Sequence, residues 1–474
     1  MNKNKSYQSN ININNFGVIG NADIDVAPLT VFIGPNSSGK SFVAKLIQCF
    51  SLPHESTIVE KGFIHLLNSS KNFNESNLNL FNEFDMRFKE YLNSNPTLNS
   101  DPFVINFKEF RPLIEEVILK HLADVFKEEI MEQFEMDLDD LINFNKDFFE
   151  IRINNNIFKK ERDKPFLLPV NTLFLRSSSP NGSNDENAVL HLYFDEENNI
   201  YVQIESSVVD KDESFLTIYG LIGSIIFENL LLEDSYYIPA ERSELIMDKR
   251  LLIRKIQNKS DLSKNQSDVL ANIINIDKSD KGDFFDLSCQ FEKEFSGIFV
   301  DVEDNGVLNE IVYRSSQFDR QISSKILSTS IHEMSIFSLY LKYILKKGDL
   351  LIIEEPEAHL HPANQRLLVK YFVKAINQGL KILITTHSDY IISQIDNMIN
   401  LNNVSEADLG SLNYTKDHIL NFEDVNIYNF KKNQDNSYDA EKIDIDEDGF
   451  MEDNFSKIAD ELYEESIFIR NSSF

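Results

Sequence analysis

The residues best suited to chemistry begin with a glycine-rich run near the N-terminus. It reads Gly34, Pro35, Asn36, Ser37, Ser38, Gly39, Lys40 and Ser41, and it fits the pattern G-x-x-x-x-G-K-[ST] in full. The glycines let backbone N–H groups approach phosphate, and the start of the following helix adds partial positive charge. Lys40 would reach the β- and γ-phosphate oxygens, and the Ser41 hydroxyl would ligate Mg²⁺. The run therefore predicts a binding site for ATP and Mg²⁺.

Two adjacent acids follow an apolar run in the C-terminal half. The run is Leu350–Ile353, and Glu354 and Glu355 come directly after it. Ligands of open α/β sheets bind beyond the carboxyl ends of the strands. We expect Glu354 to complete the Mg²⁺ shell and Glu355 to accept a proton from the attacking water or to orient it. An acidic pair at this place is also typical of a helix start or a solvated turn.

A histidine follows a second apolar run of the same kind. The run is Lys381–Thr385, and His387 comes two residues after it, where its ring can meet a γ-phosphate or the attacking water. A lone histidine at a strand end is more often structural. The two motifs described above favour a catalytic role instead.

Strands and helices must bring these three segments together. Leu29–Ile33 is a short apolar run that ends at the glycine-rich segment, and residues 41–50 have helical spacing, so the order is strand, loop, helix. Pro362–Asn377 has helical spacing between the two later strands, which implies parallel pairing by a crossover helix. The sequence therefore predicts an α/β fold with a largely parallel sheet, an antiparallel β subdomain and helical insertions.

Changes in composition along the chain predict six segments. These are the N-terminal part of an ATPase head (1–51), a helical insertion (52–165), a strand and helix part of the head (166–242), a helical arm suited to dimerisation or partner binding (243–296), the C-terminal part of the head (297–430), and an acidic hairpin and helix (431–474). Short strands are expected at 173–176, 189–194 and 200–204, a helix over 215–232, and strand-rich sequence over 297–324.

The composition bears on DNA binding, on the redox compartment and on membrane insertion. The formal charge of −31 and the isoelectric point near 4.7 repel polyanions, so DNA binding stays open but is not favoured, and Lys249, Arg250, Arg254 and Lys255 form only a modest basic group. Two cysteines without metal-type spacing fit a reducing cytoplasm. The sequence contains no apolar run of about 18 residues, so we expect no membrane span.

Together the segments match a known group of proteins. The glycine-rich run, the run Glu354–Pro362 and the end Thr385–Asp389 resemble ABC-type ATPases of the SMC, RecF and OLD group. More narrowly, they resemble stand-alone ATPases of bacterial antiphage systems such as Septu and PARIS. In ATPases of this group ATP lies between two heads, so the resemblance implies a homo-oligomer with at least a dimer of heads and up to a hexamer.

Two further segments gain meaning from this resemblance. Leu327–Glu333 occupies the signature position, where Ser328 and Ser330 would donate hydrogen bonds to phosphate, although the segment lacks the usual glycine. A serine helix cap with Glu333 as its capping-box partner is the alternative. Tyr237–Ser243 resembles a Pro-Ala-Glu-Arg segment of these ATPases, and Arg242 would touch phosphate or a neighbouring acid, or form a structural ion pair.

The C-terminal segment does not predict a nuclease. Asp444–Gly449 carries the Asp-x-Asp pattern after His387, without the glutamate strand that a TOPRIM nuclease needs, and the remaining chain is too short for that domain. The same residues imitate the start of a calcium loop, but Phe455 stands where glutamate is required. We expect a turn with solvated acids here.

These observations favour a slow ATPase of antiphage defence that senses or regulates a separate effector, a nuclease or toxin. The alternative is a DNA-repair ATPase of RecF or SMC type that clamps DNA. An ATP-sensing scaffold with little turnover is a third reading, and a transporter subunit is improbable because of the long insertions and the missing signature glycine.

Overall fold

The computed structural model describes the chain in several stretches. These are residues 9–49, 103–106, 130–141, 150–154, 172–175, 188–194, 199–205, 235–243, 245, 262–304, 309–315, 320–450 and 453–471, together with the single residues 83, 86, 87 and 90. The chain forms two compact units: residues 1–53, 129–155 and 232–474 make up the first, and residues 54–128 and 156–231 the second. The basic group at 249–255 and the helix expected over 215–232 lie outside the described residues.

Five neighbouring parallel strands form one end of a nine-stranded sheet in the first unit. In spatial order they are β15 (Val425–Lys432), β3 (Leu29–Ile33), β14 (Lys381–Thr385), β13 (Leu350–Glu354) and β9 (Ser235–Ile238). All side chains of β3 and β13 are buried, as expected for strands covered on both faces. The predicted parallel pairing is confirmed, and β14 lies between the other two motif strands.

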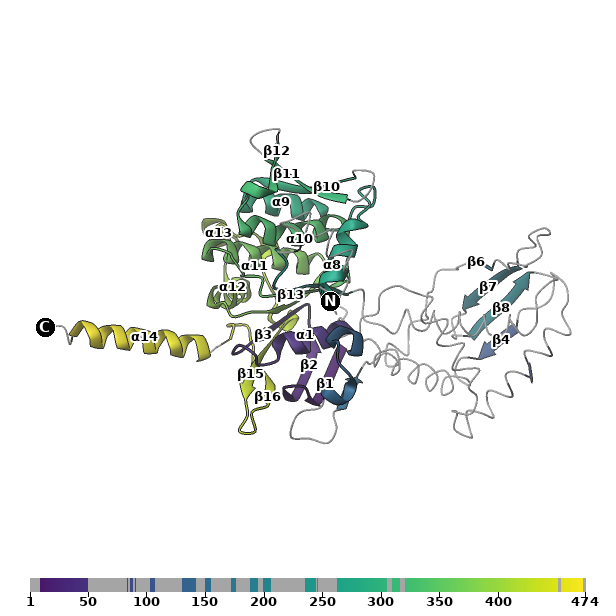
Figure 1. Cartoon of the computed structure of the whole chain (residues 1–474), viewed down its shortest axis with the longest axis horizontal. Helices are drawn as coiled ribbons and strands as arrows, with labels where there is room; N and C mark the ends of the chain where they lie inside the picture. The colour runs from purple at the N-terminus through teal and green to yellow at the C-terminus, as the bar shows by residue number, and fades with distance from the viewer. Residues whose placement is uncertain are drawn as a thin grey trace. The chain divides into compact units, whose positions relative to one another are not determined.

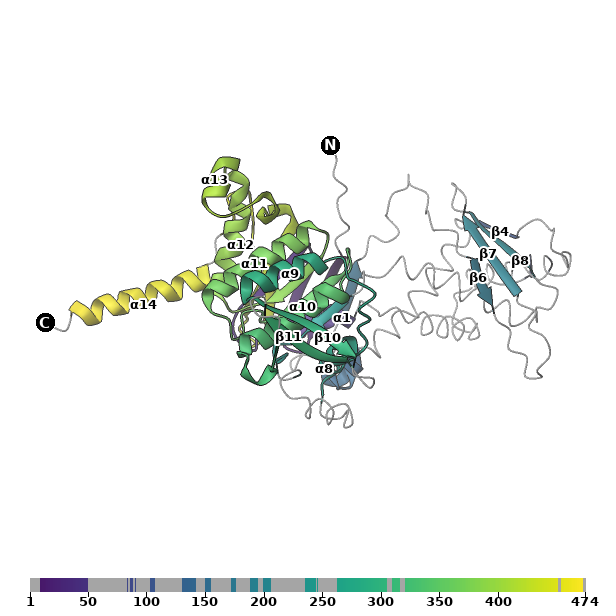
Figure 2. The same ribbon diagram turned by 90° about the horizontal axis from the view of Figure 1, so that it is seen from above.

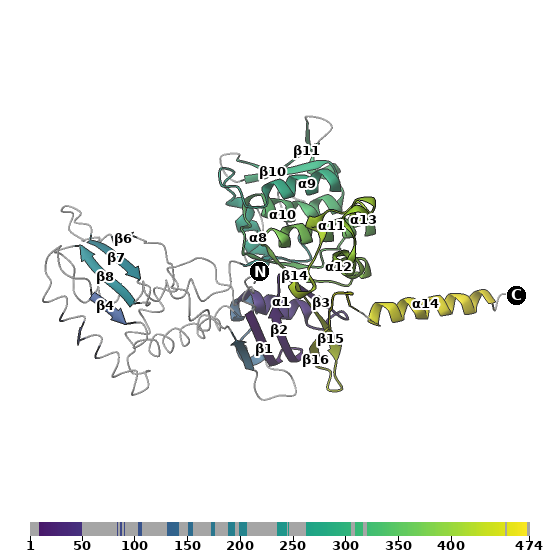
Figure 3. The same ribbon diagram turned by 180° about the vertical axis from the view of Figure 1, so that it is seen from behind.

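Helices cover both faces of these strands (Figures 1 and 3). Helix α1 (Lys40–Cys49) lies on the side of β1 and β2, whereas α9 (Phe285–Phe295), α10 (Thr329–Tyr343) and α11 (Pro362–Asn377) lie on the other side. Seen from above, α11 runs beside α12 (Asp389–Asn400) (Figure 2). The crossover helix α11 begins and ends at the predicted residues, because His361 caps its first turn and Pro362 starts it.

The remaining strands of the sheet are mostly antiparallel. They are β5 (Glu150–Asn154), β1 (Ser9–Phe16), β2 (Ile19–Val26) and β16 (Tyr438–Lys442), in that spatial order before β15. Strand β5 lies in the segment predicted as a helical insertion, and there the helical prediction is wrong. Its isoleucines alternate at the strand period, and Ile151 and Ile153 pair with Ile13 and Ile11.

A separate antiparallel sheet stands beside the helices of the first unit. It contains β10 (Ile298–Asp304), β11 (Asn309–Ser315) and β12 (Gln321–Ile322), which confirms the strand-rich prediction for this region. Helix α8 (Lys264–Ile274) contacts β11, and α9 contacts β10. Below them, the Phe291 ring packs edge-on against Phe337 with ring centres 5.6 Å apart, and Phe337 packs against Phe372 at 5.5 Å. These aromatic contacts join α9, α10 and α11 in one core.

The second unit contains a four-stranded antiparallel sheet. Its order is β4 (Phe103–Asn106), β8 (Asn199–Glu205), β7 (Ala188–Phe194) and β6 (Thr172–Leu175). The three predicted short strands are confirmed, but they pair with each other and with β4 and not with the nine-stranded sheet. Strand β4 lies in the segment 52–165, so the helical prediction is wrong there too. Within the segment 166–242, β9 is the described strand that joins the large sheet. The predicted domain boundaries stay a prediction.

The C-terminal part confirms the expected hairpin and helix. Strands β15 and β16 pair antiparallel, and helix α14 (Asp453–Asn471) follows (Figure 1). The acidic segment before α14 makes a tight turn, in which Asp446 and Gly449 exchange backbone hydrogen bonds of 3.0 and 3.1 Å. The short helix α13 (Glu406–Ser411) lies between α12 and β15. Among the described helices, none has both the length and the apolar character that crossing a bilayer requires.

Candidate nucleotide-binding site

The glycine-rich run forms a tight loop between β3 and α1. Gly34 and Gly39 have φ of 134° and 95°, which residues with a side chain rarely adopt. A Cβ at Gly34 would come within 2.8 Å of the Phe430 carbonyl oxygen, and a Cβ at Gly39 within 2.5 Å of Ile19. Both positions therefore require glycine for geometric reasons, and the tight loop that they permit can turn its N–H groups toward phosphate oxygens.

Lys40 lies folded over this loop. Its Nζ donates hydrogen bonds to the carbonyl oxygens of Gly34 and Pro35, at 3.0 and 2.7 Å, and lies 3.4 Å from the Ser38 hydroxyl. Burial lowers the pKa of Lys40 to about 8, and the charges of Glu355 and Glu357 oppose that shift. The loop lysine is thus electrostatically coupled to acids at the end of β13.

Glu354 ends strand β13 as a buried carboxylate with an unused oxygen. Its Oε2 accepts a weak hydrogen bond of 3.3 Å from the Ala240 backbone, whereas Oε1 accepts none from the residues that the structure describes. The buried Tyr237 hydroxyl lies near it, and burial together with the Glu354 charge raises the pKa of Tyr237 well above its ordinary value. An unsatisfied buried carboxylate oxygen is costly, so this side chain suits a cation ligand.

Glu355 and His387 meet beyond the ends of β13 and β14. The distance between His387 Nε2 and Glu355 Oε1 is 3.9 Å, and both side chains are partly exposed. Burial, followed by the charge of Lys40, lowers the pKa of His387, so this imidazole is mostly neutral near pH 7. Glu355 has a φ of 41°, in the left-handed region that residues with a side chain seldom enter.

Glu357 is a site residue that the sequence reasoning missed. Its Oε1 accepts hydrogen bonds from the Thr386 hydroxyl at 2.8 Å and from the His387 backbone N–H at 2.7 Å. Burial raises its pKa. The carboxylate thereby fastens the turn after β13 to the turn that carries His387. Its position two residues after Glu355 in an acidic run was the available signal.

Arg242 is buried beneath these turns and does not face solvent. Its Nε lies 2.8 Å from Glu333 Oε2 in an ion pair whose side chains are 1% and 0% exposed. Burial lowers the pKa of Arg242, and the Glu333 charge is the largest opposing cause. Of the alternatives from the sequence, the ion pair with a neighbouring acid is the one observed. The other oxygen of Glu333 lies 3.1 Å from Nδ1 of the exposed His359.

Ser328 and Ser330 lie at the start of α10. Their hydroxyls are 2.8 Å apart, and Ser328 is the N-cap residue but makes no side-chain capping bond. The capping-box alternative is wrong, because Glu333 lies beyond the first turn of the helix and pairs with Arg242 instead. The contact of these serines with the phosphate held by a second copy of the chain stays a prediction.

The fold and these residues define a class of protein. A glycine-rich loop between a buried parallel strand and a helix, with acids and a histidine at the ends of the next two parallel strands, is the arrangement of a P-loop nucleotide-binding ATPase domain. A family model described as "AAA ATPase domain" matches residues 8–392. The chain therefore belongs to this AAA ATPase domain family. No curated protein matches the chain.

Solved structures similar to this chain include three SMC head domains. An SMC head bound to the C-winged helix domain of ScpA is 12% identical to this chain, with a TM-score of 0.38; the match covers 92% of this chain and 98% of that SMC head. The SMC head of Thermotoga maritima is 10% identical, with a TM-score of 0.34; the match covers 93% of this chain and 100% of that head. A third structure is an SMC head from Pyrococcus furiosus with an extended coiled coil, bound to the C-terminal domain of ScpA. It is 10% identical, with a TM-score of 0.35, and the match covers 96% of this chain and 99% of that head.

Proposed function

We propose that this chain binds ATP with Mg²⁺ and hydrolyses it slowly to ADP and phosphate. One observation carries the proposal: Lys40, Glu355 and His387 gather at the ends of three neighbouring strands. The charge of Glu355 acts on Lys40, and the same carboxylate lies 3.9 Å from His387. A phosphate group held by the loop would therefore have a cation, a base and a neutral imidazole around it.

Each residue has a role that its surroundings support. The N–H groups of residues 34–39 and the Lys40 ammonium bind the phosphates, and Ser41 and Glu354 hold the metal through the hydroxyl and the unused Oε1. A Mg²⁺ ion held there would supply positive charge against the charge that develops on the phosphate oxygens. Glu355 accepts the proton of the attacking water, and His387 orients that water or donates a hydrogen bond. The chain supplies mainly position and electrostatics, which suffice for phosphoryl transfer.

A second copy of the chain would complete this site. Ser328 and Ser330 contact each other at the start of α10, where helix N–H groups and hydroxyls can donate to phosphate. The resemblance to ATPases with two-headed sites supports a homo-oligomer in which these serines reach the partner's nucleotide. Light scattering with ATP and with ADP tests this, and a monomer that hydrolyses ATP at the full rate would refute it.

For the cellular role we favour antiphage defence in the cytoplasm, with a separate effector such as a nuclease or toxin that the ATPase holds or releases. The motif resemblance supports this role, and the charge of −31 speaks against broad DNA binding. The DNA-repair alternative of RecF or SMC type fits the same ATPase domain equally well. Partner identification must decide between them.

The enzymatic proposal is tested with purified protein. We expect Mg²⁺-dependent phosphate release by the wild type, loss of ATP binding in Lys40→Ala, and retained binding with at least about 100-fold lower turnover in Glu355→Gln. Equal turnover in Glu355→Gln and wild type would remove Glu355 from the mechanism. Affinity purification of the wild type and of Glu355→Gln from cells that carry the native gene neighbourhood then tests the role. A co-purifying effector supports defence, and DNA with repair factors supports the alternative.

A further inference from the structure

The turn that carries Glu355 is held in a strained conformation by its neighbours. A residue with a side chain at a φ of 41° costs on the order of 1–3 kcal/mol and persists only where surrounding contacts fix it. On one side, the Glu355 N–H donates to the Thr385 carbonyl oxygen at 2.9 Å. On the other side, the Glu355 carbonyl oxygen accepts a hydrogen bond of 3.2 Å from Arg242 Nη2. The predicted base thus depends on a neighbouring strand and on one buried arginine.

The same guanidinium also holds the preceding residue. Arg242 Nη1 donates to the Glu354 carbonyl oxygen at 2.8 Å and to the Pro239 carbonyl oxygen at 3.3 Å. The donors of a guanidinium lie in one rigid plane, so the ion pair with Glu333 fixes where its other N–H groups point. Glu333 comes from α10, whereas the Glu354 and Glu355 carbonyls that Arg242 holds lie at the end of β13. One planar group therefore sets the path of the chain from Glu354 to Glu355.

We propose that Arg242 is a positioning residue, oriented by Glu333, that keeps Glu355 in its left-handed conformation and so directs its carboxylate toward His387. The inference rests on the proposed function, in which Glu355 activates water. Arg242 touches neither nucleotide nor metal in this scheme. It acts through the backbone of the residues that do.

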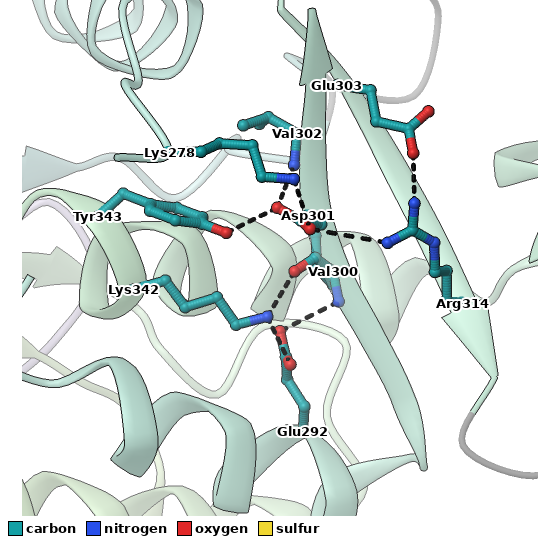
Figure 4. A network of polar contacts seen from close by, with 9 residues as sticks. All are labelled: Lys278, Glu292, Val300, Asp301, Val302, Glu303, Arg314, Lys342 and Tyr343. Atoms are coloured by element: carbon teal, nitrogen blue, oxygen red, sulfur yellow. Dashed lines mark hydrogen bonds and ion pairs between the residues drawn. The ribbon is translucent and has the colours of Figure 1, made fainter. Parts of the chain in front are cut away.

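A second buried ion pair on the same helix provides a matched control. Lys342 of α10 lies 2.7 Å from Glu292 Oε2, with side chains 5% and 2% exposed, and its Nζ also donates to the Val300 carbonyl oxygen (Figure 4). Glu292 in turn accepts a hydrogen bond of 3.1 Å from the Val300 N–H. This pair joins α9, α10 and β10. Like the Arg242 pair it combines a buried carboxylate, a buried cation and a backbone carbonyl, but its contacts do not include the end of β13.

The test compares Glu333→Gln with Glu292→Gln, and adds Arg242→Lys. A lysine preserves the buried charge, but its single ammonium cannot hold Glu333 and both carbonyls together. We expect kcat for ATP to fall about 10- to 100-fold in Glu333→Gln and Arg242→Lys, with the KM for ATP within about threefold of wild type, because a displacement of about 1 Å at the reacting group has that effect. Glu292→Gln should keep its kcat, measured below its unfolding midpoint. Equal kcat values in Glu333→Gln and Glu292→Gln would overturn the proposal.

A measurement independent of turnover separates this inference from the proposed function. Hydrogen exchange of the backbone amides of residues 354–359, followed by mass spectrometry, reports whether the turn is held. We expect faster exchange in Arg242→Lys and Glu333→Gln, and exchange at the wild-type rate in Glu292→Gln. If the wild type hydrolyses no ATP, the proposed function fails while this difference still supports Arg242 as the residue that holds the turn. Unchanged exchange in Arg242→Lys would refute the positioning role whatever the turnover.

Discussion

Replacing Glu357 should separate the anchoring of His387 from the chemistry of Glu355. The Glu357 carboxylate accepts two hydrogen bonds, from the Thr386 hydroxyl at 2.8 Å and from the His387 N–H at 2.7 Å. A leucine at this position removes both acceptors and leaves the His387 N–H without a partner. A buried donor left without a partner costs about 1–3 kcal/mol and a lost hydrogen bond about 0.5–1.5 kcal/mol, so we expect Glu357→Leu to lose about 2–4 kcal/mol of folding stability.

The same change should also slow turnover, because the turn with His387 is no longer fixed to the turn with Glu355. We expect kcat to fall about 10- to 100-fold in Glu357→Leu. Glu357→Gln is the matched control: its amide oxygen still accepts from Thr386 and His387, and burial already disfavours the charge at this position. Stability should then drop by only about 1 kcal/mol, and turnover by less than about fivefold. Thermal unfolding and steady-state phosphate release measure the two quantities. Identical kcat values for the leucine and glutamine variants would refute the reasoning.

Three further predictions concern titration and backbone geometry. ATP affinity should weaken as the pH rises above about 8, where free Lys40 loses its proton, and Lys40→Arg should remove that dependence in a binding titration. Burial raises the pKa of Glu292 to about 7 from 4.5 in the unfolded chain, so between these pH values the folded state holds a proton that the unfolded state has lost. The free energy of unfolding should therefore fall as the pH rises from 4.5 to 7, by at most about 3 kcal/mol, and urea unfolding of Glu292→Gln should lack that decline. Gly449→Ala should lose about 2 kcal/mol or more of folding stability in the same assay, because φ at Gly449 is 93° and a Cβ would come within 2.0 Å of Asp396 Oδ1. Gly410→Ala is the control, because a Cβ there meets open space and should not destabilise the fold.

Local patterns in the sequence were sufficient for the parallel core. The apolar runs at 29–33, 350–353 and 381–385 coincide with β3, β13 and β14 to within one residue. Buried parallel strands are continuous in apolar character, and a helix of suitable length separates the last two. Because parallel strands carry their ligands at their carboxyl ends, the positions of Glu354, Glu355 and His387 beyond those ends followed from the same patterns.

Those local patterns could not predict the long-range contacts. Strand β5 pairs with β1 across more than a hundred residues, and only its short isoleucine alternation marks it as a strand. The ion pair of Arg242 with Glu333 joins the turn after β9 to helix α10, and no spacing rule connects the two segments. The serines at the start of α10 suggested a capping box, but the tertiary partner of Glu333 prevailed over the local one.

The order of strands in the large sheet has a consequence for how the protein is made. The strand before the phosphate loop, β3, is flanked by β14 and β15, so Leu29 pairs with Ile382 on one side and with Val425 on the other. At a synthesis rate of about 5–20 residues per second, β3 waits on the order of tens of seconds on the ribosome for both neighbours. During that time the backbone N–H and C=O groups along its edges have no native strand to pair with, which leaves them open to pairing with other chains. A nascent chain that stops before β15 would contain every motif of the nucleotide site and still lack one of the two strands that flank β3.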